Sequence, residues 1–116
     1  MDVNSKDIWK RTSLSYAAES GHEAMAKLLL EKPGINITSR DEWGRTPLSY
    51  AAESGHRVVV KLLLEKPGVH VNSEDDGGRS PLTYAAESGH AAVVILLREK
   101  CHTTWLLFTF LFEHGK

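Results

Sequence analysis

The stretch TPLSYAAESGH at residues 46–56 recurs as TSLSYAAESGH at residues 12–22 and as SPLTYAAESGH at residues 80–90. Equivalent positions are 34 residues apart in both cases, since 46 − 12 and 80 − 46 are equal. Roughly two-thirds of the positions are identical between the first two units. A period of this length is typical of stacked repeats, in which each unit buries its apolar face only against its neighbours.

The second unit contains local signals for two short helices. Thr46 is a good N-cap and proline suits the first helical position, so a helix is predicted from Pro47 to Ser54. Gly55 is predicted to end it in a left-handed conformation. A second helix is predicted from Arg57 to Lys66, where a Pro-Gly pair follows. Residues 67–79 then form a turn-rich arm.

The presence of this arm helps to decide between two repeat families that have similar periods. Tetratricopeptide repeats consist of two longer helices with short joins, so a long arm argues against them. The residues TPLSYAA at 46–52, GH at 55–56 and LL at 62–63 resemble the ankyrin repeat, whose pattern is T-P-L-H-x-A-A, then G-H, then L-L and N. The sequence of these repeats also resembles that of ankyrin arrays common in fungal multidomain proteins.

The resemblance implies an all-α fold, an ankyrin-repeat solenoid of stacked helix-turn-helix units with β-hairpin fingers. We expect an ankyrin-repeat domain over residues 1–100. Its repeats would span about 7–40, 41–74 and 75–100, and the first arm would enter from residues 3–6.

Some positions depart from the family pattern. The family histidine after leucine, which often ties neighbouring loops together, is replaced by Ser15, Ser49 and Thr83, so the resemblance implies weaker ties. The turn residue Gly44 is replaced by Lys10 in the first unit, so that finger turn is expected to differ.

Residues 101–116, CHTTWLLFTFLFEHGK, leave the repeat register and form a divergent apolar tail. One interpretation is a degenerate fourth-repeat helix over residues 107–112, which would cover the third unit. The other is a frameshift or retained intron. The chain also begins inside a repeat, which suggests a fragment of a longer array with other ankyrin repeats or domains.

Composition argues against several classes of partner. The net charge is −1 and basic residues are mixed with acidic ones, so no nucleic-acid partner is expected. No apolar run approaches the roughly 20 residues that span a bilayer, so no membrane partner is expected. The single cysteine, Cys101, fits a reducing compartment, and a cytoplasmic location is expected, with the nucleus left open.

The heptapeptide YAAESGH contains the residue types of a hydrolase, with Glu53, Ser54 and His56 in the second unit. A nucleophile needs a converged base and an oxyanion hole, and three copies on an open surface would need three such sites. Catalysis is therefore a remote alternative. His22, His56 and His90 would lie about 8–10 Å apart in a stack, too far apart to share a metal. No catalytic, cofactor or metal site is expected.

Recognition of a partner at the protein surface is the function that remains. The sequences of the three units differ most at the finger turns. The chain is predicted to be a protein-protein interaction module and scaffold without enzymatic activity, binding a protein partner through a concave face of finger turns and first helices. A structural spacer or a non-functional fragment of a larger array is the alternative. The exposed tryptophans are the best contacts, because tryptophan is enriched in binding hot spots. The predicted partner-binding residues are Ile8, Trp9, Arg11, Glu19, Glu42, Trp43, Arg45, Glu53, Asp76, Arg79 and Glu87.

Overall fold

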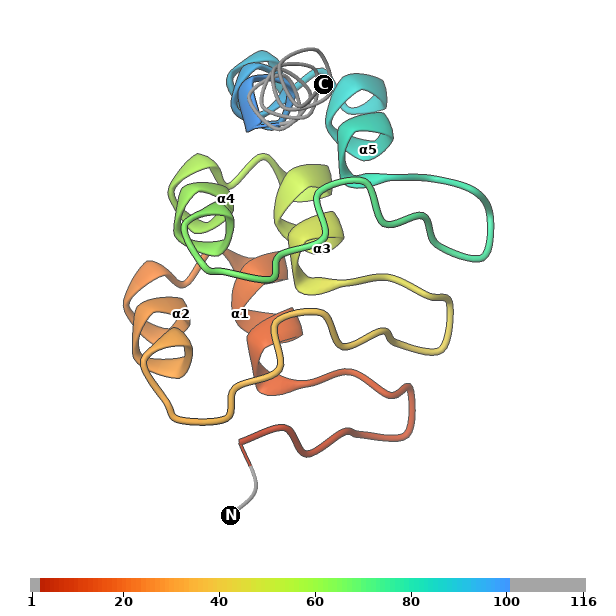
Figure 1. Cartoon of the computed structure of the whole chain (residues 1–116). Coiled ribbons are helices and arrows are strands. Elements are labelled where there is room, and N and C mark those ends of the chain that lie inside the picture. The colour runs from red at the N-terminus through yellow and green to blue at the C-terminus, as the bar shows by residue number, and fades with distance from the viewer. Residues whose placement is uncertain (1–2, 101–116) are drawn as a thin grey trace, which may run out of the picture.

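A computed structural model describes residues 3–100, which form a stack of helix pairs. The first helices of the pairs lie in one layer and the second helices in another, and loops project from the first layer (Figure 1). The first layer contains α1 (Ser13–Ser20), α3 (Pro47–Ser54) and α5 (Pro81–Glu87), and the second contains α2 (Glu23–Leu30), α4 (Arg57–Leu64) and a helix over residues 91–100.

The helix bounds follow the local signals closely. The predicted helix from Pro47 to Ser54 is confirmed, and Gly55 ends it with a φ of 74°. The predicted end of the next helix at Lys66 is wrong by two residues, since α4 ends at Leu64. The N–H of Lys66 instead donates to the carbonyl of Leu63, at 3.2 Å, so the chain tightens into a turn before the Pro-Gly pair.

A hydroxyl pair starts each first helix. The Thr46 side chain accepts from the N–H of Ser49, at 3.3 Å, and the two hydroxyl oxygens lie 3.1 Å apart in a buried position. The same arrangement joins Thr12 to Ser15. The resemblance implied that these hydroxyls would tie neighbouring loops together weakly. That expectation is wrong, because the Ser49 hydroxyl bonds to Thr46, the N-cap residue of its own helix.

Small residues set the spacing of the first layer. Ala51 and Ala52 are fully buried, and α3 packs between α1 and α5. Their small side chains let the helix backbones approach closely. Larger apolar side chains, including Leu48, Val59 and Leu63, fill the space between the two layers and are at most 2% exposed. The stack is thus one continuous core to which every repeat contributes.

The projecting loops form the fingers of the stack, which we call the finger loops (residues 7–11, 41–45 and 75–79). In the second loop the N–H of Asp41 donates to Arg45, at 3.0 Å, and the N–H of Gly44 donates back to Asp41, at 3.1 Å. No residue between 3 and 100 is in a β-strand, so the β-hairpin form of the fingers is not confirmed.

The first finger loop makes the same turn without a glycine. Lys10 has a φ of 62°, and its N–H donates to the carbonyl of Asp7, at 2.9 Å. The expectation of a different turn is therefore wrong. The left-handed conformation is strained for a residue with a Cβ atom, so this loop holds Lys10 in place at a cost.

Two further predictions concern the apolar C-terminal tail and membrane-spanning helices. The apolar tail over residues 101–116 and its fourth-repeat helix lie outside the described residues. Among the helices within residues 3–100, none is long and apolar enough to cross a bilayer.

Candidate protein-binding face

An aspartate organises each finger loop. Asp41 Oδ1 accepts from the N–H groups of Trp43 and Arg45, at 2.8 and 2.9 Å, and its Oδ2 accepts from the hydroxyl of Tyr50 on α3. Asp7 and Asp75 make the equivalent bonds in the other two loops. One carboxylate thus fixes both the turn and its position against the first helix. We call the surface formed by the finger loops and the first helices the finger face.

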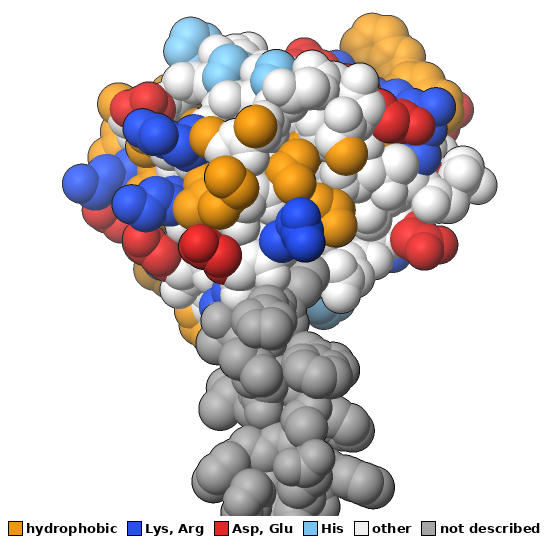
Figure 2. Space-filling model, turned by 90° about the horizontal axis from the view of Figure 1, so that it is seen from above, with side chains coloured by type: hydrophobic (Ala, Val, Ile, Leu, Met, Phe, Trp, Pro, Cys, Tyr) orange, Lys and Arg blue, Asp and Glu red, His pale blue; other side chains and the backbone are white. Residues whose placement is uncertain are grey.

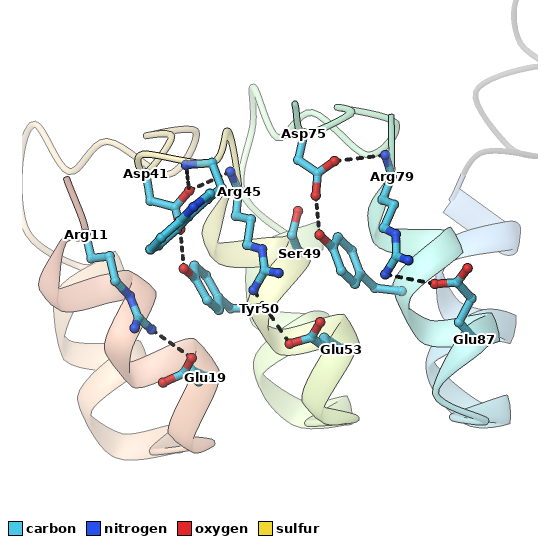
Figure 3. Close-up of polar contacts among 12 residues, drawn as sticks. Arg11, Glu19, Asp41, Arg45, Ser49, Tyr50, Glu53, Asp75, Arg79 and Glu87 are labelled. Carbon is cyan, nitrogen blue, oxygen red and sulfur yellow. Dashed lines mark hydrogen bonds and ion pairs between the residues drawn. The ribbon is translucent and has the colours of Figure 1, made fainter. Parts of the chain in front are cut away.

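Arginine and tyrosine side chains alternate across the finger face (Figure 3). The guanidinium carbon of Arg11 lies 4.1 Å from the ring centre of Tyr16 and 4.5 Å from that of Tyr50 in the next repeat. Arg45 lies 5.7 Å from Tyr50 and 5.3 Å from Tyr84, so it also bridges two repeats. These distances are within the range of cation–π attraction. The series, which ends with Arg79, is called the Arg–Tyr ladder.

Each arginine of the ladder also pairs with a glutamate. The N···O distances are 2.8 Å for Arg11–Glu19 and 3.1 Å for Arg79–Glu87, with a longer 3.9 Å for Arg45–Glu53 (Figure 3). The glutamates therefore form a row of paired charges with the arginines, and the finger face is close to neutral along this line.

The Asp–Tyr hydrogen bonds shift pKa values in all three finger loops. Burial and the hydrogen bond to Asp75 raise the pKa of Tyr84 to about 12, and the same two causes raise the pKa of Tyr50. The hydrogen bond from Tyr16 lowers the pKa of Asp7. Burial opposes the same effect at Asp75, but the bonds from Tyr84 and from main-chain N–H groups hold the pKa of its carboxyl below the usual range. The phenols of Tyr50 and Tyr84 therefore stay protonated at neutral pH, and the carboxyls of Asp7 and Asp75 stay ionised.

The tryptophans are held in place but remain open to solvent. Trp9 is 46% exposed and Trp43 is 49% exposed, and the neighbouring Ile8 is 82% exposed. Their main chains are fixed, because the carbonyl of Trp9 accepts from the N–H of Glu42, at 2.9 Å, and that of Trp43 accepts from Asp76, at 3.0 Å. Two indoles on neighbouring loops are thus presented from a rigid backbone.

The predicted contact residues divide into two groups. Arg11 and Arg45 are half-buried in the Arg–Tyr ladder, so they mainly position other side chains. The finger-tip residues are exposed, namely Ile8, Trp9, Glu42, Trp43 and Asp76, as are Glu19, Arg79 and Glu87, whereas Glu53 is intermediate. Sequence reasoning missed the organising aspartates and tyrosines, although they recur nine residues apart in every unit.

The histidine of the heptapeptide joins neighbouring repeats. His56 Nε2 donates to the main-chain carbonyl of Glu19, at 3.0 Å, and its ring lies against Gly21. His90 makes the same contacts with Glu53 and Gly55. Because Nε2 already donates to a carbonyl, it does not serve as the base for the serine of a catalytic set. Within residues 3–100 no group of three His, Cys, Asp or Glu side chains is arranged to hold a metal.

Comparisons with known protein families agree with this geometry. The family model described as "Ankyrin repeats (3 copies)" matches residues 36–104. The family model described as "Ankyrin repeats (many copies)" matches residues 1–51. Comparison with curated proteins finds no match.

Proposed function

The chain belongs to the ankyrin-repeat family, and we propose that it binds a protein partner through the finger face. Ankyrin repeats generally act as protein–protein interaction modules, and the family is typically non-enzymatic. The proposed repeats span about residues 7–40, 41–74 and 75–100. Neither a cofactor nor a catalytic residue is part of the proposal.

The observation that supports this face is the pair of half-exposed indoles on neighbouring finger loops. Trp9 and Trp43 are 46% and 49% exposed, while their main chains are bonded to the next finger loop. A rigid backbone reduces the ordering cost of binding, and a large aromatic side chain buries much apolar surface in a contact. Ile8, at 82% exposed, extends the apolar surface at the first loop.

The polar residues of the face have a supporting role in the proposal. Arg11 and Arg45 hold the loops against the first helices, since each lies between two tyrosine rings. Glu42 and Asp76 lie beside the tryptophan positions on exposed loop tips and would form the polar rim of the contact. The partner would therefore present an apolar surface to the indoles, with polar groups around it.

Site-specific crosslinking tests the face and isolates the partner in one step. A photo-crosslinking phenylalanine analogue at Trp43 is expected to capture a defined protein, whereas the same analogue at Val58 is not. Val58 is a matched control because it is 39% exposed but lies on α4, in the second layer.

The captured protein is then purified and its affinity is measured directly. Trp43→Ala is expected to weaken binding at least about tenfold, in the range of a hot-spot residue. Val58→Ala is expected to leave the affinity unchanged. Equal affinities for the wild type, Trp9→Ala and Trp43→Ala would exclude the finger face as the binding surface.

A further inference from the structure

Both joints between neighbouring repeats are built from the same contacts, made by residues 34 positions apart. In the first joint, His56 lies on Gly21 and bonds to the carbonyl of Glu19, while Arg11 lies over the ring of Tyr50. In the second joint, His90, Gly55, Glu53, Arg45 and Tyr84 repeat these contacts. A third, main-chain contact joins the finger loops, from Glu42 to Trp9 and from Asp76 to Trp43.

The first repeat presents one half of this joint on its outer side. His22 is exposed, and its ring has no glycine to lie against among the described residues. Tyr16 is 38% exposed and contacts one guanidinium group, whereas Tyr50 is 2% exposed and contacts two. Met25 is 50% exposed, although Val59, its equivalent in the second repeat, is fully buried.

The third repeat presents the other half. At Gly89 nothing among the described residues lies within 4 Å of the point that a Cβ atom would occupy, whereas the equivalent Gly21 and Gly55 are covered by histidine rings. Ala86 is exposed, although its equivalents Ala18 and Ala52 are fully buried.

Among residues 3–100, therefore, no side chain fills the joint position at the end of the stack formed by α5 and the helix over residues 91–100. Figure 2 looks onto this end, and hydrophobic side chains gather near the middle of it, with charged side chains beside them. The apolar residues that line the hollow there include Ala85, Ala86, Ala91, Val94 and Ile95.

We propose that two copies of this chain join head to tail, with the first repeat of one copy stacked on the third repeat of the other. His22 of one copy would lie on Gly89 and donate to the carbonyl of Glu87, and Tyr16 would stack against Arg79. The N–H of Ile8 would donate to the carbonyl of Gly77, as Glu42 and Asp76 do to the tryptophan carbonyls within the chain.

Complementarity is the reason for choosing a second copy as the occupant. Both halves of the joint lie on one chain, and each half matches a contact that the chain already makes twice. Within the described part of the chain Arg79 contacts one tyrosine ring, Tyr84, whereas Arg11 and Arg45 each contact two, so a second ring position beside Arg79 is not taken by any residue between 3 and 100. Such a contact joins different surfaces and does not close on itself, so it predicts assemblies that grow with concentration.

The experiment uses sedimentation velocity on the full chain and on two variants that block opposite ends. Met25→Arg places a charge on the first repeat, and Ala86→Arg places one on the third. Arginine has a high helix propensity and both positions are exposed, so each variant keeps its fold, which circular dichroism checks. Val58→Arg is the matched control, because it adds the same side chain to an exposed apolar position of the middle repeat.

The wild type and Val58→Arg are expected to assemble with increasing concentration, while Met25→Arg and Ala86→Arg alone stay monomeric. A mixture of the two blocked variants is expected to form a one-to-one dimer and nothing larger, because each retains one intact end. His22→Ala is expected to weaken assembly about fivefold, as loss of one hydrogen bond would, while His70→Ala in an exposed loop does not.

Three results would overturn the proposal. They are a wild type that stays monomeric at all concentrations, an assembly that survives Met25→Arg or Ala86→Arg, and a mixture of blocked variants that fails to dimerise. Assembly through residues 101–116 would give the second result, and so would a symmetric dimer through one end of the stack, because it would survive the substitution at the opposite end.

Discussion

The two ends of each first helix are held to the neighbouring repeat by different chemistry. At the finger end, charged and aromatic side chains alternate, as in the contact of Arg11 with Tyr50, at 4.5 Å. At the other end, a histidine ring lies directly on a glycine, and His56 donates to a carbonyl at 3.0 Å. Between the two ends lie buried alanines such as Ala51.

The difference concerns how much each end tolerates change. The finger end is partly open to water and consists of long side chains, which can adjust their positions. The histidine end depends on the absence of a single Cβ atom, so it has no such freedom. The finger end is therefore the one that can vary, as the proposed binding face would require, whereas the histidine end sets the spacing between repeats.

The largest expected effect tests the histidine end. Gly55→Ala is expected to lower the free energy of unfolding by about 3 kcal/mol, because the new Cβ would lie 2.4 Å from Nδ1 of His90 at a φ of 74°. Urea unfolding measures the loss. Gly68→Ala is the matched control, since it has a φ of 84° but no atom within 4 Å, and its loss should be about 1 kcal/mol. Equal losses would show that the histidine contact contributes nothing.

The next effect tests the finger end. Tyr50→Phe is expected to lower the free energy of unfolding by about 2 kcal/mol, because it leaves the buried carboxylate of Asp41 without its phenol donor. Tyr16→Phe removes the equivalent bond to Asp7 where the ring is 38% exposed, and water can replace it there. Its loss should be about 0.5 kcal/mol. A loss at Tyr16 as large as that at Tyr50 would contradict the dependence on burial.

The pH dependence of stability should also come from the finger end. The pKa of Tyr84 is about 12 in the fold, above the ordinary value of about 10 expected for the unfolded chain. The unfolded state therefore loses its proton first, so the stabilising contribution is present below pH 10 and is lost as the pH rises towards 12. The fold should lose about 1.5 kcal/mol by about pH 11.5 from this group.

Thermal melting of the wild type and Tyr84→Phe across this pH range measures that contribution. The variant should show a shallower fall in melting temperature above pH 10, even if it is less stable at neutral pH. Parallel curves for the two proteins would remove Tyr84 as the source of the pH dependence.

The smallest effect concerns the strained turn of the first finger loop. Lys10→Gly is expected to raise the free energy of unfolding by about 0.5–1 kcal/mol, because Lys10 has a φ of 62° that glycine adopts without strain. Chemical denaturation checks the gain. Lys10→Ala removes the charge but keeps the Cβ atom, so it should give no gain, and a gain there would point to charge rather than backbone strain.

Local features of the sequence predicted most of the fold. Thr46, Pro47 and Gly55 mark the bounds of α3, and the structure agrees at both ends. The end of α4 was placed two residues too late, since a proline can limit a helix without specifying its last turn. The turn at Lys10 was also misjudged, because the side chain of Asp7 holds it by hydrogen bonds to two main-chain N–H groups, and a propensity rule does not include that.

The candidate site was predicted less well than the fold. The exposed tryptophans followed from differences between the finger loops, and both are about half exposed. Each of the three glutamates pairs with an arginine eight residues earlier in the chain. That spacing is not a helical neighbour relation, since the arginine lies on a loop, so only the path of the loop brings the two charges together.

The sequence by itself determined the repeat, its period, the helix pairs and the alanines that let them stack, because these depend on local propensity and side-chain size. Tertiary structure alone decided which residues meet across the joints. His56 reaches the carbonyl of Glu19, and Arg11 reaches the ring of Tyr50, each 37 or more residues away along the chain. Such contacts depend on the rotation and spacing between neighbouring repeats, which result from the packing of the whole stack and are not encoded at any one position.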